Sequence, residues 1–87
     1  PDLAVSHSNL GNILKDLGKL QEAEISIRKA IELKPNLTKA YYFLSKVLSK
    51  SKKYKEALSI INQRLIHEPN NHLYQGEKKR IEFLLSI

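Results

Sequence analysis

The sequence of 87 residues contains no cysteine, and it has only three glycines and three histidines. Without cysteine the chain can form neither a disulfide nor a thiolate metal site, although this absence does not identify its compartment. The glycines form no phosphate-binding loop, and the histidines lack the spacing of a metal-binding set. No apolar run approaches the ~18 residues that a membrane-spanning helix needs. The sequence therefore predicts no metal, no cofactor and no membrane span.

Side chains for catalysis are also scarce. Ser6, His7 and Ser8 are adjacent, but consecutive residues of a helix point in different directions and cannot form a nucleophile–base pair. His7 falls on the apolar face of a predicted helix, so we expect a buried imidazole there. His67 and His72 flank a predicted helix junction, and two histidines alone make a weak metal site. We interpret the chain as non-catalytic, and an enzyme would need residues outside these 87.

Acidic residues are few in the second half of the chain. The net charge is +6, and residues 38–71 hold seven Lys or Arg against two acidic residues. Residues 4–37 hold five Lys or Arg against four acidic residues, so their charges nearly cancel. The positive field of residues 38–71 favours an acidic partner. The basic turn at 50–55 contains one aromatic residue, Tyr54, but it has neither the base-stacking aromatics nor the groove-reading geometry of nucleic-acid binders. Neither nucleic acid nor an anionic membrane surface is therefore the expected partner.

The sequence repeats with a period of 34 residues. The matching pairs are Leu10 and Leu44, Leu14 and Leu48, Ala23 and Ala57, Ile27 and Ile61, and Pro35 and Pro69. A fixed period of this length indicates a solenoid built from one supersecondary unit. Such a unit buries its apolar face only by stacking, and it presents a surface to partners. Binding is therefore a better hypothesis than catalysis.

These residues resemble the tetratricopeptide repeat. Residues 4–37 fill the positions of that motif with His7, Leu10, Gly11, Leu14, Gly18, Ala23, Ile27, Ala30 and Pro35. Residues 38–71 fill them with Tyr41, Leu44, Ser45, Leu48, Lys52, Ala57, Ile61, Arg64 and Pro69. The resemblance implies an all-α, right-handed superhelical solenoid of antiparallel helix pairs, here two repeats at 4–37 and 38–71. It also implies a protein-interaction module, but it does not identify the partner.

The repeat and the apolar periodicity predict helices at 4–17, 20–33, 38–51 and 54–67. We expect capping groups from Asn36, Thr38, Asn70 and Asn71. The predicted core of the first helix is His7, Leu10, Leu14 and Leu17, and that of the third is Ala40, Tyr41, Leu44, Val47 and Leu48. Gly11, Ala23 and Ala57 are small where helices of this family cross closely.

The last residues depart from the repeat but keep an amphipathic pattern, formed by Tyr74, Ile81, Phe83, Leu84 and Leu85. We predict a fifth helix at 71–86 that caps the array. In the domain division, residues 72–87 form this capping or linker segment. Arg64 and His67 stand where an ordinary next repeat would meet Ala and Leu, which favours a cap. A linker helix toward a further domain is the alternative.

The start of the chain suggests a missing neighbour. Pro1 precedes Pro35 by 34 residues, so it occupies the position of the proline that closes an earlier repeat. We expect a segment of a longer array, with residues 1–3 as a remnant of an upstream repeat, and a cytoplasmic location for the parent chain. Because the first helix then lacks a neighbour, we expect Val5 and Ile13 to be less covered. This open end predicts self-association as a homo-oligomer.

The resemblance places the first helix of each repeat along a concave surface. The side chains that it assigns to this surface are Val5, Ser8, Asn12, Lys15 and Asp16, then Lys39, Tyr42, Lys46, Ser49 and Lys50. Spacing alone also puts Lys39, Tyr42, Lys46, Lys50 and Lys53 on one helix face. We predict that Asn12, Lys39, Tyr42, Lys46 and Lys50 bind an acidic or C-terminal peptide segment, with Tyr42 as an exposed apolar contact. A solvated lysine-rich face is the alternative.

Some members of this family hold a partner's terminal carboxylate in a clamp of Lys, Asn and Arg. Asn12 fits the first Asn position of that clamp. Ser8, Phe43, Leu73 and Glu77 stand where the other clamp residues are needed. This argues against the clamp and leaves a peptide-binding groove as the first hypothesis. An architectural spacer or oligomerisation array attached to a catalytic domain elsewhere in the parent chain is the second.

Overall fold

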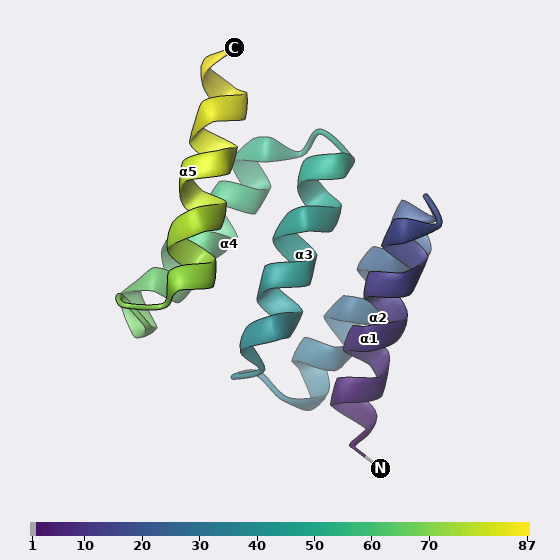
Figure 1. The fold of residues 1–87 in the computed structure, drawn as a ribbon. Coiled ribbons are helices and arrows are strands. Elements are labelled where there is room, and N and C mark those ends of the chain that lie inside the picture. The colour runs from purple at the N-terminus through teal and green to yellow at the C-terminus, as the bar shows by residue number, and fades with distance from the viewer. Residues whose placement is uncertain (1) are drawn as a thin grey trace.

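The computed structural model describes residues 2–87 and contains five helices there (Figure 1). They are α1 (Leu3–Asp16), α2 (Leu20–Leu33), α3 (Thr38–Lys50), α4 (Tyr54–His67) and α5 (His72–Ser86). The predicted helices agree with these bounds within one residue at each end. Pro1, on which the interpretation as part of an earlier repeat rests, lies outside the described residues. Of the helices described, none combines the length and the apolar character needed to cross a bilayer.

The helices form two layers. Each packs antiparallel against the next in the chain, and α3 also contacts both α1 and α5. As Figure 1 shows, α1, α3 and α5 therefore lie side by side in one layer, with α2 and α4 behind them. This arrangement is the predicted stack of helix pairs, completed by α5.

The two repeats end their first helices in the same way. Gly18 has a positive φ of 80°, and Lys52, 34 residues later, has a φ of 62°. In each turn the next amide donates to a carbonyl five residues back, Lys19 to Leu14 at 2.9 Å and Lys53 to Leu48 at 2.8 Å. A positive φ favours glycine. The second repeat nevertheless keeps the same turn with lysine in the glycine position.

The core runs through the middle of the array. The predicted α3 stripe is confirmed, since Ala40, Leu44, Val47 and Leu48 are buried and Tyr41 is half-buried. The small residues are also where expected, because Ala23 and Ala57 are fully buried and Gly11 lies against Ile27.

The predicted core of α1 is wrong in part. Leu10 is 48% exposed and Leu17 is 66% exposed, while His7 and Leu14 are half-buried. The buried residues of α1 are instead Ala4, Ser8 and Gly11. The reason is the open end: α2 packs against α3, the helix that carries the equivalents of Leu10 and Leu14, whereas no described helix covers the outer side of α1. Val5 and Ile13 are exposed there, as expected.

The predicted caps are correct only for α5. Asn71 accepts a hydrogen bond from the Tyr74 amide at 3.2 Å. The N-cap of α3 is Leu37, whose side chain makes no capping hydrogen bond, and the Thr38 hydroxyl faces Glu68 instead. Asn36 and Asn70 do not cap helices either. The first helix has a cap that the sequence reading missed, because Asp2 accepts from the Ala4 and Val5 amides at 2.9 and 3.2 Å.

Helix α5 covers α3 and α4. Tyr74 and Ile81 are fully buried and Leu84 is half-buried. Phe83 and Leu85 are exposed, contrary to the predicted pattern.

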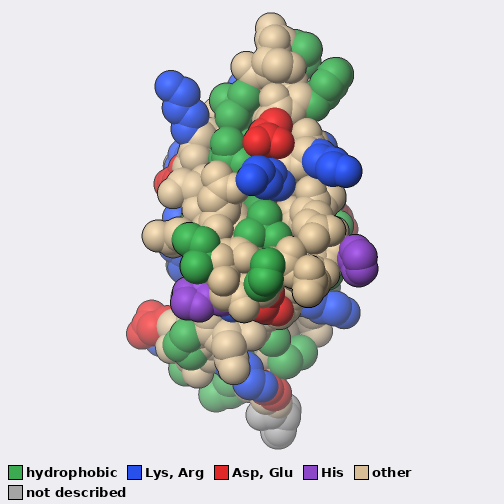
Figure 2. Space-filling model, turned by 90° about the vertical axis from the view of Figure 1, so that its left-hand side faces the viewer, with side chains coloured by type: hydrophobic (Ala, Val, Ile, Leu, Met, Phe, Trp, Pro, Cys, Tyr) green, Lys and Arg blue, Asp and Glu red, His purple; other side chains and the backbone are tan. Residues whose placement is uncertain are grey.

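The two α4 residues that favoured a cap differ in their surroundings. The guanidinium of Arg64 lies 4.4 Å from the Tyr41 ring centroid and donates to Glu68 at 3.0 Å, while His67 is exposed. The outer side of α4 and α5 forms the end of the molecule that Figure 2 shows.

Candidate functional site: the basic face of α3

The candidate site centres on the side chains that α3 turns away from α2 and α4. Lys39 and Lys50 are exposed, whereas Tyr42 and Lys46 are half-buried. The centroids of the Tyr42 and Phe43 rings are 5.9 Å apart, and the Lys46 ammonium lies 4.9 Å from the centroid of the Tyr42 ring. Tyr42 is therefore packed among its neighbours rather than an exposed aromatic, because the following helical turn covers it.

A buried carboxylate from α5 joins this face. Glu77 is only 3% exposed, and its Oε1 lies 3.5 Å from Lys46 Nζ. Glu77 also accepts from the Ser45 hydroxyl at 2.7 Å and from Arg80 at 2.8 and 3.1 Å. The fork of two bonds from Arg80 is the strong, charge-assisted kind. We call Ser45, Lys46, Glu77 and Arg80 the Glu77 cluster.

The sequence marks Glu77 only as a mismatch to a clamp and predicts no role for Arg80. The pairing of Glu77 with Ser45 spans 32 residues, and the rotation of α5 about its own axis decides it. One signal was present: Glu77 and Arg80 are an i,i+3 pair that can form an ion pair on a helix. That spacing marks a pair but does not indicate that it is buried.

The cluster changes the ionisation of Glu77. Burial alone would raise the pKa of Glu77, but the hydrogen bonds from Arg80 and Ser45 and the charges of Arg80 and Lys46 outweigh it. The pKa therefore lies below its ordinary value of 4.5. A lowered folded-state pKa means that the ionised group stabilises the fold above the unfolded-state pKa. This contribution is lost as the pH falls through the folded-state value.

Lys53 does not belong to this face, contrary to its spacing. Its ammonium lies 3.5 Å from Glu24 of α2, because the turn after α3 redirects the chain toward the second layer. Neither Lys39 nor Lys50 has an ion-pair partner within 4.0 Å among residues 2–87. The accessible positive charge of α3 therefore comes from these two lysines, with Lys46 shared with Glu77.

The α1 side of the concave surface is more closed than expected. Asn12 is half-buried, and the Lys15 side chain is 10% exposed with its ammonium 3.4 Å from Asp16. Ser8 and Ser49, which were assigned to the groove, are buried, and neither hydroxyl has a hydrogen-bond partner in the described chain. These two serines therefore line the contact between helices rather than an open groove.

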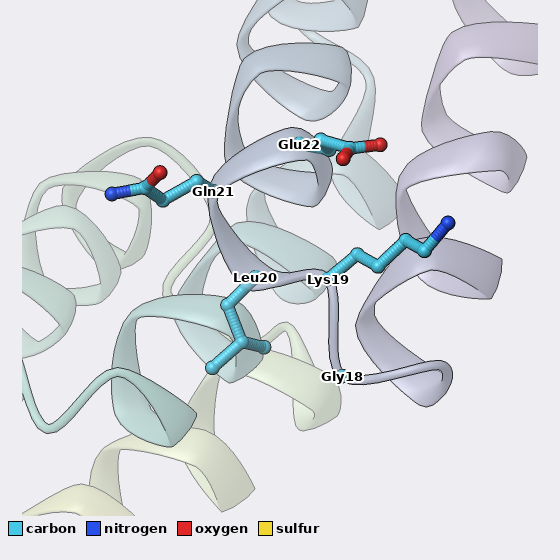
Figure 3. Close-up of a pocket in the computed structure, with 5 residues that line it drawn as sticks. All are labelled: Gly18, Lys19, Leu20, Gln21 and Glu22. Carbon is cyan, nitrogen blue, oxygen red and sulfur yellow. The ribbon is translucent and has the colours of Figure 1, made fainter.

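A further hollow lies away from the face of α3. The turn before α2 borders a shallow hollow of about 360 Å³ lined by residues 18–22. Figure 3 shows Leu20 turned toward the other helices and Gln21 pointing away from Lys19 and Glu22. Within residues 2–87 no group of three His, Asp or Glu side chains is placed to hold a metal ion.

Two serines of α3 provide a matched test of the Glu77 cluster. Ser45→Ala should lower the free energy of unfolding by about 1–3 kcal/mol, because a buried carboxylate loses a hydrogen-bond donor. Ser49→Ala should leave stability unchanged or slightly raised, since its buried hydroxyl has no partner among the described residues and alanine favours helix. Urea unfolding at neutral pH measures both. Equal losses in the two variants would contradict the role of Ser45.

Comparison with known proteins agrees with the repeat pattern. The model of one tetratricopeptide repeat family matches residues 4–37, and that of a second matches residues 38–63. No curated protein matches the chain. Among solved structures, the second TPR domain of human RPAP3, determined in complex with the HSP70 peptide SGPTIEEVD, is similar with a TM-score of 0.83. The two are 25% identical, over 93% of this chain and 68% of that one.

Proposed function

Because the chain belongs to the tetratricopeptide repeat family, we propose that it is a non-catalytic binding module for an acidic peptide segment. The segment lies along the inner face of α3, with Lys39 and Lys50 as its charge contacts. The observation that carries this proposal is a pair of exposed lysines that have no carboxylate partner within residues 2–87 and lie on the same helix face as the half-buried Tyr42. Asn12, Tyr42 and Lys46 border the same face and provide polar and apolar contacts.

The similar RPAP3 domain supports an acidic ligand, because the HSP70 peptide in its structure contains two glutamates and ends in aspartate. In this chain Phe43, Leu73 and Glu77 occupy positions where the resemblance would require clamp residues. We therefore propose that acidic side chains of the ligand, rather than its terminal carboxylate, provide most of the charge contacts. Cytoplasmic location remains a prediction.

The expected affinity is modest. Exposed charge contacts contribute about 0.2–1 kcal/mol each and are screened by salt. The Glu77 cluster already neutralises part of the charge of Lys46. Binding should therefore be micromolar at best and should weaken as the ionic strength rises.

The test uses a double variant and a matched control. We expect Lys39→Glu with Lys50→Glu to weaken an acidic nonapeptide by about tenfold or more, with unchanged helicity. Lys19→Glu with Lys55→Glu changes the net charge equally at exposed positions outside this face and should retain binding. Fluorescence anisotropy measures the binding of both double variants to two peptides. One is the acidic peptide, and the other has Gln in place of each acidic residue. Equal binding of the two peptides, or equal loss in the two double variants, would reject the proposal.

The alternative is an architectural role, in which the array spaces or oligomerises a parent protein. The observation that favours it is the uncovered apolar surface on the outer side of α1 and α2. A spacer should show contacts with other copies or repeats but no salt-dependent peptide ligand.

A further inference from the structure

The outer side of α1 and α2 carries an apolar groove of about 360 Å³. Its lining consists of His7, Leu10 and Leu14 from α1, and Glu22, Ile25, Ser26 and Lys29 from α2. Ile25 is 71% exposed and Leu10 is 48% exposed. The Ser26 hydroxyl donates to the His7 carbonyl at 2.8 Å and so ties the two helices together at the groove.

The internal repeat shows what kind of element fits such a groove. Leu10 and Leu14 correspond to Leu44 and Leu48, which are 1% and 0% exposed because α3 packs against α2. The same positions are covered by a helix in one repeat and open in the other. The groove is therefore shaped for a helix with an apolar stripe.

The charges at the groove are self-complementary. Glu22 lies three residues before Ile25 and Lys29 lies four residues after it, so all three side chains share one face of α2. Glu22 and Lys29 are also equally far from the midpoint between Ile25 and Ser26. If a second α2 packs antiparallel about a two-fold axis at that midpoint, each Glu22 faces Lys29 of the other copy. In the described chain Glu22 has no ion-pair partner within 4.0 Å, and Lys29 contacts only the exposed Glu32, at 3.6 Å.

We propose that a second copy of this chain occupies the groove and forms a two-fold symmetric dimer. Ile25 of each copy enters the groove of the other beside His7 and Leu10, and two Glu22–Lys29 pairs flank the apolar contact. A contact of this kind is isologous, so it closes after two copies. It leaves the inner face of α3 open for a peptide.

The opposite end of the molecule is a poorer partner for this groove. The hollow between α4 and α5 is bordered by Lys78, Lys79 and Glu82, and Figure 2 shows charged side chains interrupting the apolar surface at this end. A head-to-tail stack would place these charges against Leu10 and Ile25. The symmetric contact instead pairs apolar with apolar and acid with base.

Charge reversal tests the proposal through the oligomeric state. By sedimentation equilibrium the wild-type chain should dimerise. Glu22→Lys or Lys29→Glu alone should weaken the dimer by about tenfold or more, since each places like charges opposite one another. The double variant Glu22→Lys with Lys29→Glu should recover it. Glu82→Lys and Lys79→Glu, exposed reversals on α5, should leave the dimer unchanged.

A second variant separates association from folding. Ile25→Asp should give a monomer with unchanged helicity, because Ile25 is mostly exposed within one copy, and it should still bind the acidic peptide. A wild-type chain that stays monomeric at millimolar concentration would overturn the proposal and leave the groove to a further repeat. Failure of the double reversal to recover the dimer would overturn it as well.

Discussion

Removal of residues 73–87 should leave the rest of the chain largely unfolded or aggregated at room temperature. Helix α5 contributes the fully buried Tyr74 and Ile81 and the nearly buried Glu77. Its loss would also remove the partners of α3 groups, because the Ser45 hydroxyl donates to Glu77 and the Thr38 carbonyl accepts from the Tyr74 hydroxyl. Burial of one large apolar side chain contributes roughly 1.5–3 kcal/mol, whereas a domain of this size has a total stability of only roughly 5–10 kcal/mol.

Circular dichroism during heating and amide NMR dispersion measure this effect. Phe83→Ala is the matched control, because Phe83 belongs to the same helix but is 64% exposed, so its variant should melt close to the wild type. A truncated chain that melts at the wild-type temperature would show that α5 adds little to the fold. That result would favour a linker helix over a cap.

The repeat predicted the backbone well because each helix end has a local cause. The bounds of α2 and α4 match the prediction at both ends, since a tight turn precedes each helix and a proline follows it. The turns after α1 and α3 have the same hydrogen bonds, although one uses Gly18 and the other Lys52 at the position of positive φ. Local chemistry and spacing therefore sufficed to place the helices.

The exposed faces were harder to predict, because they depend on neighbours. Leu10 has the same repeat position as the buried Leu44, yet it is half-exposed, since no described helix covers the outer side of α1. A periodic pattern identifies the apolar face of a helix but not whether another element lies on it. The exposed Leu10 lies beside Ile25 in the apolar groove of α1 and α2.

The lysines of the candidate site were predicted from the sequence, but the buried Glu77 among them was not. Lys39 and Lys50 are exposed on one face of α3, as their spacing indicated. The charge of Lys46 is partly neutralised by Glu77, which lies 31 positions later in the sequence. Long-range pairing of this kind follows from the packing of α5 on α3, which the α3 sequence alone does not specify.

Substitution of Gly11 by alanine should destabilise the chain, whereas the same substitution at Gly76 should stabilise it. A Cβ at Gly11 would overlap Ile27 Cγ1 and would stand 2.9 Å from Ile27 Cδ1 and 3.1 Å from the Ala23 carbonyl oxygen. Overpacking of a close contact costs about 1–3 kcal/mol, which exceeds the gain of about 0.5–1 kcal/mol from replacing a helical glycine by alanine. At Gly76 nothing lies within 4 Å of the added carbon, so only the gain remains.

Urea unfolding should therefore move the two midpoints in opposite directions with similar slopes. Gly11→Leu should lower the midpoint further, because α1 would have to separate from α2. Ile27→Ala removes both side-chain atoms that the new Cβ would meet. Combined with Gly11→Ala, it should cost less than the sum of the two single losses, since residues in contact do not act independently. If Gly11→Ala instead raised the midpoint as Gly76→Ala does, the close crossing of α1 and α2 would not limit the size of this residue.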